Sequence, residues 1–227
     1  MRSWSFHFFP IAWPFLLGLL VLLALTVAMV EVGVVRYAYE RVGVDRRYVF
    51  LVLLLSLVGS YVNIPVAEFA SERVLSNQEV TYFGMRYVIP MVEERPRTLL
   101  AVNLGGAVVP VLLSCYLVAK NGLYGQAFLA TFIVAAASHW VAQPIRGVGI
   151  AMPVFLPPLL AASVSLLLTR TATPVLAYAA GSLGTLIGAD LLNLGALREL
   201  GAPVASIGGA GTFDGVFLTG IIAVLLA

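Results

Sequence analysis

The sequence has few charged residues and almost no cysteine, and both shortages limit the class of protein to which it can belong. Only 11% of the 227 residues are charged, against about 25% in ordinary soluble domains. Cys115 is the only cysteine, so an internal disulfide and a cysteine-based zinc site are both excluded. The formal net charge is +2 and the chain contains no run of basic residues. We therefore expect no nucleic acid among its partners.

The chain also lacks the short sequence motifs that are typical of common catalytic and nucleotide-binding sites. The stretch "GGAGTF" (208–213) is rich in glycine, but it has neither the lysine nor the preceding strand of a nucleotide-binding P-loop. Neither a G-x-S-x-G elbow nor an H-E-x-x-H motif occurs. Any function must therefore be sought in isolated polar residues.

Apolar residues are abundant instead: 61% of the chain is hydrophobic and the mean hydropathy is +1.00. Apolar runs of spanning length predict an all-α integral membrane protein, a single polytopic domain over residues 1–227 with about seven transmembrane helices. The first run is interpreted as a retained span, because no A-x-A cleavage site follows it. The expected spans are 10–31, 48–66, 98–119, 123–142, 153–169, 174–196 and 204–227.

One linker, residues 67–97, is too polar to span, since it holds five glutamates and four arginines. Within it "EVTYFGMRYV" (79–88) has strand-like composition, with Gly84 as a turn. This predicts a small extramembrane β-hairpin. An irregular amphipathic loop is the alternative.

Positive charge suggests an orientation in the cell membrane. The predicted short loop 32–47 carries Arg36, Arg41, Arg46 and Arg47. Basic residues in short loops favour the cytoplasmic side. We therefore expect the N-terminus outside and the C-terminus in the cytoplasm, although the totals on the two sides, six and seven, are close.

Threading the seven spans in alternation brings most of the polar residues to one side of the bilayer. Asp190 and Asp214 are the acidic members of this group. An ionised residue in the bilayer costs about 3 kcal/mol on insertion scales, so such residues usually mark a site. Helix capping or structural hydrogen bonding is the alternative role. The predicted substrate- or ion-binding residues are His139, Gln143, Arg146, Asn193, Asn103 and Asn63.

The two aspartates each lie 12 residues from Ala202, which belongs to the polar link "RELGAP" (198–203). In an antiparallel helical hairpin they would lie at equal depth. The G-x-x-x-G patterns at 184–188 and 211–215 favour close packing of the two spans. Two close carboxylates share one proton, which predicts a catalytic pair.

Three functions fit such a pair. The best fit is an intramembrane aspartyl-type hydrolase, in which one carboxylate activates water and the other protonates the substrate. The alternatives are a proton- or cation-coupled carrier of a small solute and a non-catalytic membrane subunit. His139 with the carboxylates would also suit a divalent metal, although the sequence specifies no cofactor. The expected partners are the lipid bilayer and a small solute or membrane-embedded substrate, with a homo-oligomer as a further option.

Three segments resemble a bacterial and archaeal family of multi-pass membrane proteins of unknown function, over residues from about 50 to the end. They are "AVNLGGAVVPVLLSCYL" (101–117), "SHWVAQPIRGVGIAMPVFLPPLLAA" (138–162) and "GSLGTLIGADLLNLG" (181–195) with "SIGGAGTFDGVFLTG" (206–220). A looser resemblance is to the presenilin and prepilin-peptidase class, which implies one catalytic aspartate on each of two neighbouring spans. Asp214 follows "GAGTF" and Asp190 follows "LIGA", so neither lies in that class's G-x-G-D motif.

Overall fold

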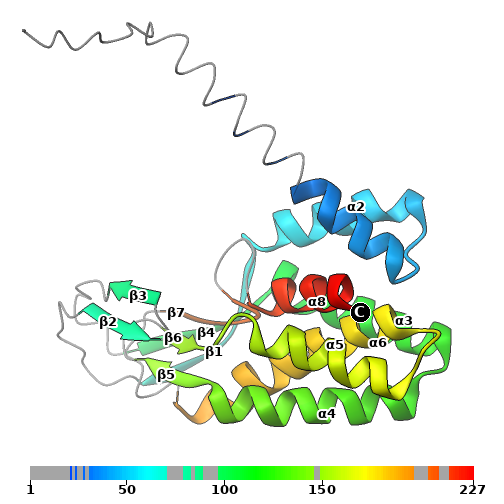
Figure 1. The fold of residues 1–227 in the computed structure, drawn as a ribbon. Helices are drawn as coiled ribbons and strands as arrows, with labels where there is room; N and C mark the ends of the chain where they lie inside the picture. The colour runs from blue at the N-terminus through cyan, green and yellow to red at the C-terminus, as the bar shows by residue number, and fades with distance from the viewer. Residues whose placement is uncertain are drawn as a thin grey trace, which may run out of the picture.

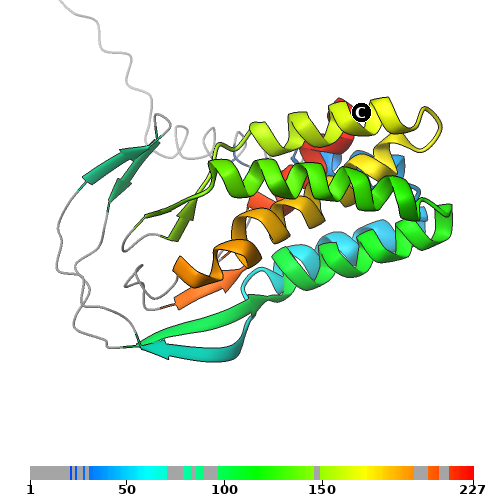
Figure 2. The same cartoon turned by 90° about the horizontal axis from the view of Figure 1, so that it is seen from below.

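The computed structural model describes residues 31–70, 79–82, 85–88, 97–145, 149–196, 204–209 and 215–227, together with Val21, Ala24 and Ala28. Its helices form a bundle, and its strands gather at one end of that bundle (Figures 1 and 2). The helices are residues 31–41, α2 (Arg46–Gly59), α3 (Val109–Asn121), α4 (Tyr124–Val141), α5 (Leu156–Leu168), α6 (Thr173–Thr185) and α8 (Gly215–Leu226). Shorter helical segments are the π-helical η1 (Leu104–Val108) and η2 (Leu186–Asp190) and the 3-10 helix η3 (Leu191–Ala196).

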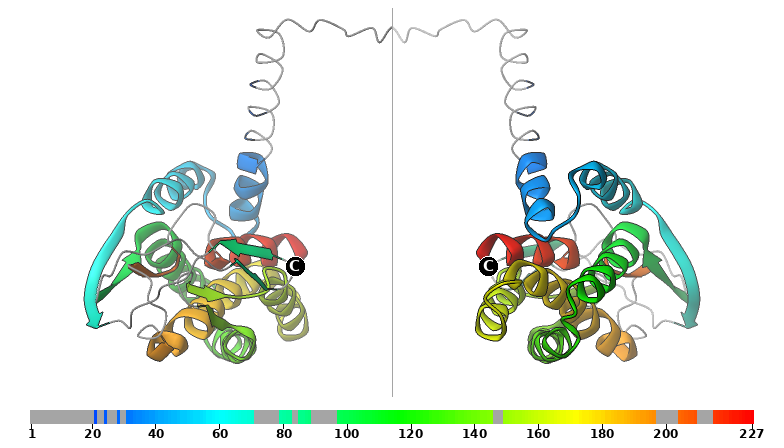
Figure 3. Two further views of the ribbon diagram at one scale, coloured as in Figure 1. Left: turned by 90° about the vertical axis from the view of Figure 1, so that its left-hand side faces the viewer. Right: turned by 90° about the vertical axis from the view of Figure 1, so that its right-hand side faces the viewer.

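Helix α6 is the centre of the bundle, where α3, α4, α5 and α8 all pack against it (Figure 3). Eleven of its thirteen residues are buried. Many of these are alanine or glycine, which let neighbouring helices approach closely. A helix that is apolar on all sides is stable only when other elements surround it.

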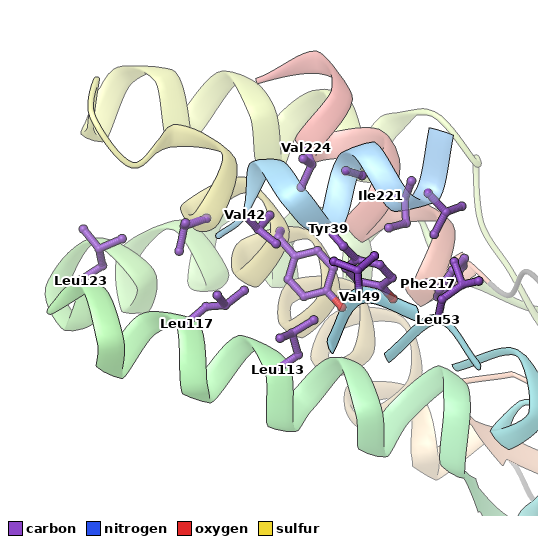
Figure 4. Close-up of a cluster of buried hydrophobic side chains, with 14 residues drawn as sticks. Tyr39, Val42, Val49, Leu53, Leu113, Leu117, Leu123, Phe217, Ile221 and Val224 are labelled. Carbon is purple, nitrogen blue, oxygen red and sulfur yellow. The ribbon is translucent and has the colours of Figure 1, made fainter. Parts of the chain in front are cut away.

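The first described helix packs into the same core rather than forming a loop. Residues 31–41 are helical, and α2 begins at Arg46. Val35, Ala38 and Tyr39 are buried in a cluster with side chains of α2, α3, α6 and α8 (Figure 4). The Tyr39 ring lies 6.2 Å from that of Tyr178, between ring centroids. The predicted loop 32–47 is therefore wrong: apolar residues three and four apart form a helical stripe among its arginines.

Three strands form a sheet in the order β1-β4-β7: β1 (Asn63–Ala70), β4 (Arg97–Asn103) and β7 (Val204–Ile207). β1 and β4 are antiparallel, whereas β4 and β7 are parallel, with Val102 opposite Ile207. The prediction of an all-α fold is therefore correct only in part. The predicted spans 48–66, 98–119 and 204–227 each include a strand, because a short apolar run fits a buried strand as well as a helix.

The predicted hairpin is confirmed, as β2 (Glu79–Tyr82) pairs with β3 (Met85–Val88) in antiparallel register. A second small ladder joins β5 (Gln143–Ile145) to β6 (Gly149–Ala151) between α4 and α5. The predicted helical segments 123–142 and 153–169 agree with α4 and α5.

Within the described residues, two helices are long and apolar enough to cross a membrane, by length and composition. They are Leu104–Asn121 and Thr173–Ala196, each with a mean hydropathy of 1.5. α5 and α8 are apolar but shorter. The structure is thus consistent with membrane association, while seven transmembrane helices are not shown.

Candidate functional site

Two glycine-rich segments connect the strands to the helix bundle, and these segments contact each other. β4 leads into Leu-Gly-Gly-Ala (104–107), and β7 leads into Ile-Gly-Gly-Ala (207–210). A Cβ at Gly106 would collide with the carbonyl oxygen of Gly208. Gly208 has a φ of +81°, a conformation that glycine adopts at no steric cost. Backbone packs directly on backbone at this crossing, which we call the glycine junction.

α2 joins the junction on its other side. A Cβ at Gly105 would collide with the Ser56 carbonyl oxygen and the Ser60 amide nitrogen, both at the end of α2. The junction therefore fixes three segments that lie far apart in the sequence. The predicted absence of a strand before "GGAGTF" was wrong, since β7 precedes it, although the P-loop lysine is still missing.

Asp190 lies at this junction. It is the last residue of η2 and is half-buried. Its Oδ2 accepts a hydrogen bond from the amide nitrogen of Gly208 at 2.7 Å. The carboxylate therefore ties the end of the long α6–η2 helix to the end of β7.

Asn103 lies on the other side of the junction and is completely buried. Its Nδ2 donates to the Ser60 carbonyl oxygen at 2.7 Å and to Asn63 Oδ1 at 3.1 Å, while its Oδ1 accepts from the Gly106 amide at 2.7 Å. Asn63 Oδ1 also accepts from Ser206 Oγ at 2.6 Å. The structure thus brings Asn63 and Asn103 together, and their amides join α2, β1, η1 and β7.

Asn193 stabilises the irregular end of the α6 helix. Its Nδ2 donates to the carbonyl oxygens of Gly188 and Ala189, at 2.9 Å each. Carbonyl groups at the end of a helix lack intrahelical partners. The Asn193 side chain supplies a hydrogen-bond donor to these carbonyl groups where η2 ends and η3 begins.

His139 lies beside an apolar groove of about 680 Å³ between α3, α4 and the α6–η2–η3 helix. The imidazole is exposed at the last turn of α4. The described lining of this groove includes His139 and Thr131 but not Asp190. Gln143 is exposed on β5 and is not part of the groove lining either. Histidine and aspartate therefore face different surroundings.

The predicted partner Asp214 and the predicted Arg146 lie outside the described residues. Asp214 directly precedes Gly215, where α8 begins. Among the described side chains, no group of three or more histidine, cysteine, aspartate or glutamate residues is placed to hold a metal ion.

α6 and α8 pack closely and antiparallel, but at other glycines than those predicted. A Cβ at Gly181 would lie 3.2 Å from Thr219 Cγ2, and one at Gly220 would lie 3.1 Å from Tyr178 Cε2. Gly184 and Gly188 face α4 instead, where Cβ atoms would collide with Val134 and with Ala135. The G-x-x-x-G pattern at 184–188 therefore serves the α4 contact.

The sequence interpretation missed the glycine junction and the two serines that bond there, Ser60 and Ser206. The sequence contained one signal. Gly-Gly-Ala occurs twice, as Asn-Leu-Gly-Gly-Ala (103–107) and as Ser-Ile-Gly-Gly-Ala (206–210). Close backbone approach is a common reason for paired glycines.

A family model described as "Protein of unknown function (DUF1614)" matches residues 57–226. This range includes α3, α4, α5, α6 and α8, the strands of the described part of the chain and the glycine junction. No curated protein and no solved structure matches the chain.

Proposed function

The chain belongs to the DUF1614 family of proteins of unknown function, and we propose that it is a multi-pass membrane protein acting as an intramembrane aspartyl-type hydrolase. Asp190 and Asp214 form its catalytic pair. The proposal has two parts, the placement in a membrane and the acid chemistry, and each has its own support.

The outer surface of the bundle supports the membrane placement. Soluble monomers rarely expose a large contiguous apolar patch. On α4, exposed Tyr124 and Trp140 mark the two ends, about 24 Å apart along the helix axis. This approaches the roughly 30 Å of a hydrocarbon core, and tyrosine and tryptophan are enriched at its two interfaces. Large apolar side chains exposed between the ends of the helices include Phe50, Leu54, Leu112, Phe128, Phe132, Leu159 and Leu166.

The hydrogen bond from Gly208 to Asp190 carries the catalytic part of the proposal. It holds the carboxylate against the strand end from which the chain continues toward Asp214 and α8. The antiparallel packing of α6 on α8 at Gly181 and Gly220 supports a common level for the two acids. A carboxylate held by a second group is oriented for catalysis.

The chemistry follows from two carboxyl groups that share one proton. The ionised group takes a proton from water as the water oxygen adds to the substrate carbonyl carbon. The protonated group gives its proton to the carbonyl oxygen. As this intermediate collapses, the bond to the leaving group breaks and the leaving group takes up the proton that the pair gained from water. One hydroxyl of the intermediate returns its proton to the other carboxylate, so the pair again holds one proton.

The test is hydrolysis of a dye-quenched transmembrane peptide by the full chain in proteoliposomes. We expect Asp190→Asn and Asp214→Asn each to abolish cleavage while the protein stays folded. Asp45→Asn is the matched control: Asp45 caps α2 by accepting from the Arg47 amide, and asparagine caps equally well. Undiminished cleavage by both variants contradicts the proposal. Unfolding of both favours the non-catalytic subunit.

A proton- or cation-coupled carrier is the second candidate, and the interrupted helices favour it. α3 begins as the π-helical η1 directly after β4, and α6 ends in η2 and η3. Discontinuous helices form the substrate and coupling-ion sites of many secondary transporters. A pH-sensitive dye trapped in proteoliposomes separates the two functions: the carrier moves protons that Asp190→Asn stops, and it cleaves no peptide.

A further inference from the structure

We propose that the end of the bundle opposite the strands binds the headgroups of anionic lipids. This end, which we call the basic end, consists of the last two turns of helix 31–41, the start of α2, the α3–α4 turn and the α5–α6 turn (Figure 3, right). Six exposed cationic side chains lie on these segments: Arg36, Arg41, Arg46, Arg47, Lys120 and Arg170. Only two acidic side chains, Glu40 and Asp45, lie among them in the described residues.

Both acidic side chains are already engaged. Glu40 Oε1 accepts from Arg36 Nε at 3.0 Å and from Arg46 Nε at 3.1 Å. The hydrogen bond from Arg46, and to a smaller extent the one from Arg36, lowers the pKa of the Glu40 carboxyl and keeps it ionised. Asp45 accepts from the Arg47 amide at 2.9 Å and so caps α2.

Three arginines of this end, Arg41, Arg47 and Arg170, have no carboxylate within 4.0 Å in the described part of the chain. They come from three different segments, so they surround the end rather than converge on one cleft. A spread of guanidinium groups suits a layer of phosphates better than a single soluble anion.

Tyrosines at the same level indicate that this layer is lipid. Tyr37, Tyr48, Tyr116 and Tyr124 are all more than half exposed within the turns nearest the basic end. The Arg41 guanidinium carbon lies 6.0 Å from the Tyr37 ring centroid, and Lys120 Nζ lies 5.7 Å from that of Tyr116. Tyrosine and basic residues together are typical of a membrane–water interface. A membrane surface supplies both an apolar layer for the rings and phosphates for the cations.

The experiment uses the full chain in nanodiscs of phosphatidylcholine, with or without phosphatidylglycerol, and measures the thermal unfolding midpoint. We expect phosphatidylglycerol to raise the midpoint of the unaltered protein, and high salt to reduce that rise. The combined variant Arg41→Gln, Arg47→Gln and Arg170→Gln should lose most of the rise. The combined Arg→Lys variant at the same positions should keep it, since the charge is retained.

Arg73→Gln, Arg86→Gln and Arg95→Gln together form the matched control, because they remove the same charge from the polar segment 67–97. This variant should keep the full rise. Equal rises in the two glutamine variants, or losses of equal size, overturn the proposal. The proposal rests on membrane placement but not on hydrolysis, and stable insertion into phosphatidylcholine nanodiscs tests that placement separately.

Discussion

The carboxylate of Asp190 accepts a hydrogen bond from the amide nitrogen of Gly208, with 2.7 Å between Oδ2 and N. This contact joins the end of the α6–η2 helix to the residue that directly follows β7, eighteen residues later in the chain. An acidic residue is costly in such an apolar chain. This contact gives it a defined position. The same contact makes Asp190 both a structural residue and a catalytic candidate, and these roles are separable by substitution.

Asp190→Leu should destabilise the protein by about 1–3 kcal/mol, because the Gly208 amide, on a buried residue, loses its acceptor. Asp190→Asn should cost much less, since its side-chain oxygen still accepts from Gly208. Denaturant unfolding in detergent measures both. Equal losses from the two substitutions would show that the hydrogen bond does not stabilise the junction.

Gly106→Ala should destabilise the protein at or above the upper end of the roughly 1–3 kcal/mol typical of overpacking. The new methyl group would meet the backbone carbonyl of Gly208, which cannot rotate away. Gly125→Ala is the control, because a Cβ there meets nothing within 4 Å and alanine favours the helix. A Gly106→Ala protein as stable as Gly125→Ala contradicts the glycine junction.

Asn103→Leu should cost at least about 2 kcal/mol, because it removes the cap of η1 and the partners of Ser60 and Gly106 in a buried site. Asn121→Leu removes a single hydrogen bond, from the side-chain amide to the Leu117 carbonyl oxygen, at an exposed position. Thermal unfolding of the two variants should therefore differ clearly. Similar midpoints would mean that Asn103 holds the segments together no more than a surface residue does.

Glu40→Gln should remove a pH-dependent part of the stability. Arg46 and Arg36 lower the pKa of Glu40 in the folded state. Its contribution is therefore fully present above the unfolded pKa, about 4.3 for glutamate, and is lost as the pH falls through the lower folded pKa. The unfolding midpoints of the unaltered and Glu40→Gln proteins should converge in acid. A gap that widens on acidification contradicts this pairing.

Local patterns predicted part of the fold well. α4 and α5 follow from apolar runs, and the β2–β3 hairpin follows from the strand-like composition on both sides of Gly84. Helix 31–41 was misread as a loop because its exposed arginines outweighed the buried stripe of Val35, Ala38 and Tyr39. Charge and burial lie on opposite faces of one helix there.

Long-range pairing was harder to predict. Threading the spans in alternation put Asn63 and Asn103 at the same end of their segments, which requires only the direction of each segment, and the structure joins the two side chains by a hydrogen bond. The parallel register of β4 with β7 joins residues 99–102 to 204–207, and no local pattern specifies such a partner. The glycine junction depends on that register, so its role emerges only in three dimensions.

The most direct test of a shared carboxylate site is disulfide formation between Asp190→Cys and Asp214→Cys in a Cys115→Ala background. A disulfide forms without backbone movement only when the two Cα atoms lie within about 7 Å. Ser182→Cys with Gly220→Cys is the positive control, as those positions touch across α6 and α8, and Asp190→Cys with Leu225→Cys is the negative control. We predict that mild oxidation in membranes cross-links Asp190→Cys with Asp214→Cys as completely as the positive control. Cross-linking of the positive control alone would contradict the aspartate pair.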